Sequence, residues 1–250
     1  KAYEGQWPDM VFEIVPYYNQ AMPVLLKHKA KNPDDIEVSI VAELNLMAAC
    51  KAKLSVAYEE ALGFARAAHS LIDTKWWHKD FDFTKDLYTH LGKLEQINAN
   101  FDLAEKYFDE CLKHLTKKED ILEIYIHKVK LYTTSSQHQK AIKTGLKGLK
   151  MLGVTLSENP ATASLAFHIL QVKTKLGFRK PADLFNLPEM KNEKALWSMR
   201  LMISLATTVY QTNQNLGFIL VLKMVLLSLK YGNSKDASFS YMAYALALCA

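Results

Sequence analysis

Glycine and proline are scarce in this chain. It has nine glycines and seven prolines in 250 residues, which is few for a protein built of β-hairpins or flexible linkers, because tight turns and linkers depend on these two residues. Apolar residues make up 50% of the chain and recur at helical spacing along most of it. The sequence therefore predicts an all-α protein with a sizeable core.

Arginine and cysteine are also scarce. Of the 31 basic residues, only Arg66, Arg179 and Arg200 are arginines. Arginine is the residue best suited to bidentate recognition of bases and phosphates, so the lysine-dominated net charge of +5 argues against nucleic acid as the partner. The three cysteines are far apart and form no CxxC pair, which favours buried thiols in the reducing cytoplasm; they are Cys50, Cys111 and Cys249.

Motifs for catalysis and for phosphate or metal binding are absent. The chain has no phosphate-binding GxxxxGK[ST] loop, no HExxH, no GxSxG and no kinase HRD or DFG. His78 has carboxylates nearby at Asp80 and Asp82, but no second ligand cluster accompanies it. Four other helical histidines are expected to lack the combination of a nearby Ser or Cys with an acid that a triad needs; they are His90, His114, His127 and His168. We therefore predict no catalytic residue, no metal and no cofactor.

No stretch of the chain is long and apolar enough to predict a membrane span. The most apolar run, residues 216–229, has 14 residues with Lys223 at its middle, and a bilayer needs about 20. We expect a buried core helix there. This sequence does not predict a signal peptide. It begins without Met and ends inside an apolar helix, which indicates a fragment of a larger protein.

Residues 86–116 predict a pair of amphipathic helices joined at residues 98–100. On the 34-residue frame of a tetratricopeptide repeat, the matching positions are Tyr88, Leu91, Gly92, Ala104, Phe108 and Cys111. Gly92 and Ala104 are small because two helix backbones must approach closely, and Phe108 is expected to fill the gap to the neighbouring hairpin. Glu95 stands where the frame expects an aromatic residue.

The same register predicts two further copies of this hairpin, one before it and one after it in the chain. In the first copy Ala61 and Ala68 take the positions of Ala104 and Cys111. In the third copy Ala141 takes the position of Ala104, and Tyr125 and Tyr132 take the aromatic positions. The three anchors Ala61, Ala104 and Ala141 are 43 and 37 residues apart, which fits helical hairpins joined by loops of different lengths. Residues 73–83 are expected to form the long loop between the first two copies.

The predicted architecture is a right-handed α-solenoid of antiparallel, tetratricopeptide-like hairpins. Residues 1–35 form an N-terminal helical segment, in which Pro16 and Pro23 should kink or break the helix. Residues 36–155 hold the repeats. Residues 156–250 form divergent helices that continue the solenoid, with a turn at residues 232–234. Their methionine-rich stripe, which includes Met199, Met202 and Met224, lines either a groove or the core.

Four lysines are predicted to share one face of a helix, because they are three or four residues apart. They are Lys140, Lys143, Lys147 and Lys150. This face either docks an acidic partner or is the solvated outer side of a repeat. No aromatic residues interleave with these lysines as stacking on nucleic-acid bases would require.

Four blocks of sequence resemble one group of proteins. They cover residues 43–62, 149–154 (LKMLGV), 187–190 (LPEM) and 227–234 (LSLKYGNS). In this order they are similar to a segment of very large bacterial hybrid signalling proteins. Members of that family carry a serine/threonine kinase-like domain, an AAA-type ATPase, a long helical repeat region, a GAF sensor and usually a histidine kinase.

The resemblance implies a place in the helical region between the ATPase and the sensor. The expected function is a non-catalytic interaction and relay module that binds a protein partner or a neighbouring domain, with homo-oligomerisation left open. The alternative is a regulatory receptor that binds a peptide or small ligand, as helical transcriptional regulators do. A third hypothesis, nucleic-acid binding through the lysine face, predicts steep salt dependence.

Overall fold

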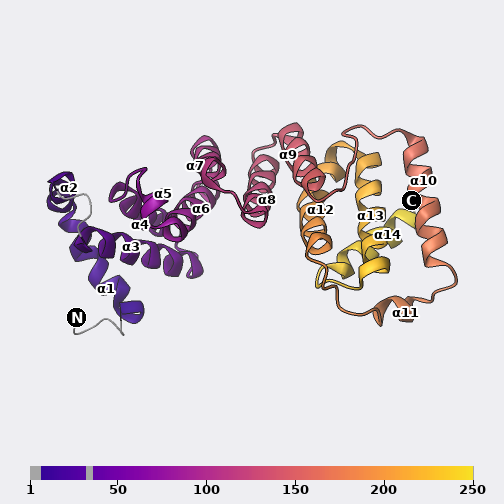
Figure 1. Cartoon of the computed structure of the whole chain (residues 1–250), viewed down its shortest axis with the longest axis horizontal. Coiled ribbons are helices and arrows are strands. Elements are labelled where there is room, and N and C mark those ends of the chain that lie inside the picture. The colour runs from indigo at the N-terminus through magenta and orange to yellow at the C-terminus, as the bar shows by residue number, and fades with distance from the viewer. Residues whose placement is uncertain (1–6, 32–35, 250) are drawn as a thin grey trace. The chain divides into compact units, whose positions relative to one another are not determined.

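A computed structural model describes residues 7–31 and 36–249, which fold into helices joined by short connections (Figure 1). Within these ranges there are 14 helices, one isolated β-bridge and no strand. The all-α prediction is therefore confirmed. Contacts divide the chain into two compact units that meet at the bond between Thr116 and Lys117, and each is described by itself. The predicted boundaries at residues 35/36 and 155/156 came from repeat matching and stay predictions.

The first unit packs its helices in chain order. α1 lies against α3, α3 against α4, α4 against α6 and α6 against α7. Apolar side chains of α1 and α3, including Val11, Val15, Leu44 and Ala48, form one of its buried clusters. The helices are α1 (Trp7–Gln20), α2 (Met22–Lys31), α3 (Ile36–Leu54), α4 (Tyr58–Ser70), α5 (Trp76–Lys79), α6 (Phe81–Ile97) and α7 (Phe101–His114).

Three helical hairpins share one turn geometry. They are α3–α4, α6–α7 and, in the second unit, α8 (Lys118–Thr134) with α9 (His138–Met151). The middle turn residue is left-handed in each, with φ of 63° at Val56, 61° at Ala99 and 58° at Ser136. The next N–H then reaches the carbonyl five residues back, as in a Schellman motif; the pairs are Ala57 to Ala52, Asn100 to Glu95 and Gln137 to Tyr132, at 2.9, 2.8 and 2.7 Å.

These turns have the same spacing as the predicted alanine anchors. The N–H groups of Ala61, Ala104 and Ala141 each donate to the carbonyl of the last turn residue four positions back, at 2.9 to 3.1 Å. All three alanines are fully buried. The hairpins are therefore equivalent in backbone geometry at this point, whatever the length of the segments that join them.

The expected break near Pro23 is present, because α1 ends at Gln20 and α2 begins at Met22. Pro23 lies in the first turn of α2, where its missing N–H leaves no helical hydrogen bond unmade, whereas Pro16 lies inside α1 without ending it. The expectation that residues 73–83 form one long loop is wrong. α5 forms within them, and α6 starts at Phe81 because the Asp80 carboxylate caps it by accepting from the Phe83 N–H at 3.1 Å.

The second unit does not pack in chain order. α12 (Glu193–Thr212) lies against both α8 and α9, whereas α10 (Thr162–Leu176) lies against α13 (Gln214–Tyr231). α13 also contacts α12 and α14 (Ala237–Cys249). The expected continuation of the repeats is therefore interrupted by α10 and by the short α11 (Pro181–Phe185), and the helix that follows the α8–α9 hairpin in space is α12.

Glycines on α9 allow the close approach of α12. A Cβ atom at Gly145 would lie 2.5 Å from Cδ1 of Leu205, and one at Gly148 would lie 3.0 Å from Cδ1 of Leu201. Both leucines are fully buried. Met199, Met202 and Met224 are also buried, so these members of the methionine-rich stripe belong to the core.

α13 is the central helix of the second unit. By length and composition alone its 18 residues would be able to cross a membrane, and 39% of them are buried. A single helix of this kind is weak evidence for a span, because core helices of soluble proteins have the same properties. Its packing against α10, α12 and α14 matches the core helix predicted from residues 216–229.

Two of the sequence blocks that carry the resemblance meet in this unit. The Asn233 N–H donates to the Pro188 carbonyl at 2.7 Å, and the Met190 N–H donates to the Asn233 carbonyl at 2.9 Å. Gly232 has a φ of 96°, and a Cβ atom there would collide with the Pro188 carbonyl oxygen. The LPEM and LSLKYGNS blocks therefore form one contact, in which only glycine fits at position 232.

Candidate functional site

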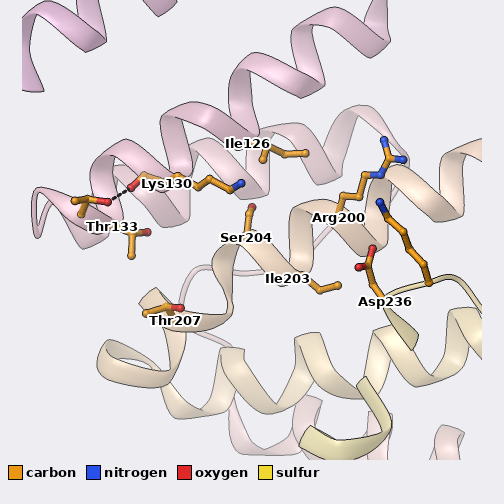
Figure 2. Close-up of a pocket in the computed structure, with 10 residues that line it drawn as sticks. Ile126, Lys130, Thr133, Arg200, Ile203, Ser204, Thr207 and Asp236 are labelled. Carbon is orange, nitrogen blue, oxygen red and sulfur yellow. Dashed lines mark hydrogen bonds between the residues drawn. The ribbon is translucent and has the colours of Figure 1, made fainter. Parts of the chain in front are cut away.

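An open groove of about 450 Å³ lies between α8 and α12 in the second unit (Figure 2). Its volume is within the range of about 300–1,000 Å³ that ligand pockets have. We call it the α8–α12 groove. Its lining residues are Ile126, Lys130, Thr133 and Thr134 of α8, Arg200, Ile203, Ser204 and Thr207 of α12, and Lys235 and Asp236 of the turn before α14.

The two walls of the groove are matching helix faces. On each helix the lining residues recur at spacings of three and four, which places them on one side. The helices are joined where Oγ1 of Thr133 lies 2.6 Å from Oγ1 of the fully buried Thr208. Thr133 donates its own hydroxyl proton to the Val129 carbonyl at 2.8 Å, so Thr208 is the donor between the helices. This bond fixes the register of α8 against α12 beside the groove.

Three cations and one carboxylate face the groove. Lys130, Arg200 and Lys235 are exposed, and Asp236 is half-buried. Figure 2 shows Lys130 extending from the Thr133 end toward Arg200 and Asp236, with Ser204 between them. The Ser204 hydroxyl donates to the Leu201 carbonyl at 2.8 Å, which leaves its oxygen able to accept a hydrogen bond from a ligand N–H. The groove is thus suited to an anionic ligand that also has N–H donors.

Arg200 is held by an aromatic neighbour. Its guanidinium carbon lies 4.9 Å from the ring centroid of Trp197, one turn earlier on α12. Such a contact contributes about 0.5–1 kcal/mol at an exposed site. It orients the guanidinium at the groove while leaving its N–H groups able to bind a carboxylate.

The predicted lysine face lies on α9 and does not line the groove. All four lysines are exposed, as both hypotheses for this face require. The Lys140 and Lys147 ammonium groups lie 5.3 and 5.5 Å from the ring centroids of Tyr132 and Tyr125. These contacts give two of the lysines a packing role, and partner binding by the face stays a prediction.

In the second hairpin the buried Phe108 packs on Gly92. A Cβ atom at Gly92 would lie 2.5 Å from Cε1 of Phe108, so the ring packs on the glycine of its own hairpin. Other predicted repeat positions are also fully buried, namely Ala68, Leu91, Ala104 and Cys111. Tyr88 joins an aromatic cluster with Trp77, His69 and Tyr107, whose ring centroids lie 5.1 to 5.7 Å from its own. Burial raises the pKa of Tyr88 to about 12.

Sequence reasoning missed an ion pair between a half-exposed arginine and a buried glutamate in the first unit. The Glu95 side chain is 0% exposed and accepts from Nε and Nη2 of Arg66 at 2.9 and 2.8 Å. Nδ2 of Asn100 donates to the same carboxylate at 2.8 Å. The hydrogen bond to Glu95 raises the pKa of Arg66. The signal in the sequence was Glu95 itself, an acid at an aromatic position, and the group joins α4, α6 and the turn before α7.

His90 lies beside a thiol, but no carboxylate in the described part of the chain completes a triad with the two. Its Nε2 lies 3.4 Å from Sγ of Cys50, and its Nδ1–H donates to the Asp86 carbonyl at 2.9 Å, so Nε2 accepts from the thiol. Burial raises the pKa of Cys50 and lowers that of His90. Both directions favour a neutral pair over the thiolate that a nucleophile needs. Among the described residues, no three His, Cys, Asp or Glu side chains lie close enough to hold a metal ion.

Comparison with known proteins links the chain to a signalling protein. It is 21% identical over 262 residues to hybrid signal transduction histidine kinase G from Dictyostelium discoideum. The aligned region covers 94% of this chain and 7% of that relative's length. Because the relative is from Dictyostelium, the comparison gives no support to the bacterial origin that the resemblance implied. No family model matches the chain, and no solved structure matches it.

Proposed function

We propose that this chain is a non-catalytic, tetratricopeptide-like interaction and relay module of a larger cytoplasmic signalling protein. In it the α8–α12 groove holds a segment of a protein partner or of a neighbouring domain. The observation that carries the proposal is the groove itself, a cationic site built from matching faces of two helices. The similarity of nearly the whole chain to 7% of a hybrid histidine kinase supports a place inside a longer polypeptide.

The relay role follows from how the groove is assembled. Its lining comes from α8, from α12 and from the turn before α14, which are segments far apart in the sequence. A bound segment contacts all three and therefore stabilises one arrangement of the second unit over others. The flanking order of kinase-like domain, AAA-type ATPase, GAF sensor and histidine kinase is part of this proposal and rests on the sequence resemblance.

The test uses the full-length protein and a groove-filling variant. Ser204→Trp places an indole between Lys130 and Arg200, and Ser238→Trp, at an exposed position of α14 outside the groove lining, is the matched control. We expect Ser204→Trp to change histidine autophosphorylation of the full-length protein and the control to leave it unchanged, with equal helix content by circular dichroism. Equal rates for both variants and the wild type would contradict the proposal.

The non-catalytic part is tested on the 250-residue chain. We expect its release of phosphate from ATP to equal that of a mock preparation. Phosphate release above the mock, abolished by a substitution in the chain, would show that the chain is an enzyme.

A regulatory receptor for a peptide or small ligand is the second candidate, and the groove volume of about 450 Å³ favours it. The sequence that adjoins this chain in the full-length protein discriminates between the two. A GAF or histidine kinase domain supports the relay module, whereas a helix-turn-helix domain supports the receptor.

A further inference from the structure

We propose that the occupant of the α8–α12 groove is an acidic, extended peptide segment whose carboxylates bind Lys130, Arg200 and Lys235. This inference rests on the proposed function and names the chemistry of the partner. It is carried by the balance of charge in the groove, where three cations face a single carboxylate, that of Asp236.

The three cations are available to a ligand. None of the residues in the ranges 7–31 and 36–249 forms a salt bridge with Lys130, Arg200 or Lys235. They come from three different elements, α8, α12 and the turn before α14. A ligand with several carboxylates along its length can therefore reach all of them, whereas a single carboxylate cannot.

The polar and apolar lining fits a peptide backbone. Ser204 has its proton engaged with the Leu201 carbonyl and offers its oxygen to a peptide N–H. Ile126 and Ile203 provide apolar contact on opposite walls. Asp236 can accept a hydrogen bond from a peptide N–H beside the carboxylates held by Arg200 and Lys235, so it helps to set the direction and register of the segment.

The same lining disfavours nucleic acid. Binding of single strands depends on aromatic side chains on which bases stack, and no aromatic residue is among those that line the groove. The nearby Trp197 ring is already occupied by the Arg200 guanidinium. The anionic groups that the groove recognises are therefore better supplied by aspartate and glutamate side chains.

The experiment measures binding of short fluorescein-labelled peptides to the 250-residue chain by fluorescence anisotropy. The probe alternates Glu and Ser, and its neutral counterpart has Gln in place of Glu. Two variants reverse charge in the groove, Lys130→Glu and Arg200→Glu. Lys143→Glu makes the same change on the exposed face of α9 outside the groove lining and is the matched control.

We expect the Glu peptide to bind at least about tenfold more tightly than the Gln peptide. Lys130→Glu and Arg200→Glu should each weaken it by about tenfold or more, because each replaces an attraction with a repulsion. Lys143→Glu should change affinity by less than about twofold, since its charge is outside the site and screened by salt. The double variant Lys130→Glu/Arg200→Glu should bind the corresponding Lys peptide better than the wild type does, which excludes simple unfolding.

Three results would overturn the proposal. They are equal loss of binding with Lys143→Glu and the groove variants, equal binding of the Glu and Gln peptides, and tighter groove-dependent binding of a thymidine oligonucleotide than of the Glu peptide. If the acidic peptide fails but Ser204→Trp still alters autophosphorylation, the acidic chemistry is wrong and the proposed function stands. If both fail, the proposed function is wrong as well.

Discussion

The two units place their close-packing glycines on opposite helices of the same kind of hairpin. In the first unit, Gly92 on α6 receives the ring of Phe108 from α7, so the hairpin closes on itself. In the second unit, Gly145 on α9 receives Leu205 from α12. One shared turn therefore leads to two kinds of packing. A glycine on the second helix leaves room for a distant helix, and the groove forms where α12 meets α8.

The units also use arginine differently. In the first unit Arg66 is committed to a buried carboxylate, and its role is to join helices. In the second unit Arg200 lies exposed on Trp197 beside the groove. The same side chain is thus structural in one unit and available to a ligand in the other, which the following variants test.

Among these variants, Arg66→Ala should cause the largest loss of stability. It leaves the fully buried Glu95 carboxylate without its half-exposed cation, and loss of a hydrogen-bonded partner of a buried charged group costs about 2 kcal/mol. Arg200→Ala removes only an exposed cation–π contact and should cost less than about 1 kcal/mol. Urea unfolding and peptide-resolved hydrogen exchange, which reports the two units separately, measure both. The apolar pair Arg66→Met/Glu95→Leu should recover most of the loss, and equal losses from the two alanine variants would contradict the distinction.

Replacing Gly92 and Gly145 with alanine should lower stability by different amounts. Gly92→Ala forces a Cβ atom into the rigid, fully buried ring of Phe108, and overpacking of this kind costs about 2 kcal/mol. Gly145→Ala meets both methyl groups and Cγ of the buried Leu205. A leucine is smaller and less rigid than a phenyl ring, so we expect a lower cost of about 1 kcal/mol once the better helix propensity of alanine is included. Thermal unfolding measures both changes.

Gly63→Ala is the control for this pair. Nothing lies within 4 Å of a Cβ atom at Gly63 on α4, so the substitution should stabilise the first unit by about 0.5–1 kcal/mol. Phe108→Leu added to Gly92→Ala should recover part of the loss. If Gly145→Ala lowered stability more than Gly92→Ala, Leu205 of α12 would be unable to move away from the added methyl group, contrary to this prediction.

The parts of the fold that were predictable are local ones. Ala61, Ala104 and Ala141 are recognisable because a small residue four positions after a turn is a short-range signal. The short α5, which carries the buried indoles of Trp76 and Trp77, was not predicted. The start of α6 at Phe81 was not predicted either, because the Asp80 that caps it resembles any other loop aspartate in sequence.

The candidate site was not predictable, because it depends on long-range packing. Ile126, Lys130 and Thr133 share a face of α8, but that face becomes a wall only when α12 packs beside it. Nothing in the sequence marks Leu205 as the side chain that packs against Gly145. The lysine face on α9 was more conspicuous in the sequence because its members share one helix. Predicting the ion pair between Arg66 and Glu95 would likewise have required the register of α4 against α6.

Glycine at the left-handed turn residues should stabilise both units. Val56 is a β-branched residue at a φ of 63°, where strain of about 1 kcal/mol is expected, so Val56→Gly should stabilise the first unit by roughly that amount. Ser136→Gly should stabilise the second unit by less, because serine is not β-branched. Val24→Gly is the control, since Val24 is an exposed valine inside α2 and glycine there should destabilise. Loss of stability with Val56→Gly would show that the shared turn is not strained.

A fall in pH should lower stability by less than the substitutions above. The loss should occur mainly in the first unit and arise from two histidines. Burial lowers the pKa of His69, which faces Tyr88, Tyr107 and Lys29, and that of His90. The unfolded chain takes up these protons below about pH 6.5 and the folded unit does so only at lower pH, so stability present at neutral pH is lost as pH falls through that window.

His69→Gln/His90→Gln should therefore flatten the pH dependence of hydrogen exchange in the first unit between about pH 7 and 5.5. Glu43 opposes this loss, because burial raises its pKa and protonation then favours the folded state. The variant and the wild type share Glu43, so the difference between their profiles isolates the histidines. A profile that stays as steep without the two imidazoles would show that their burial does not couple folding of the first unit to proton uptake.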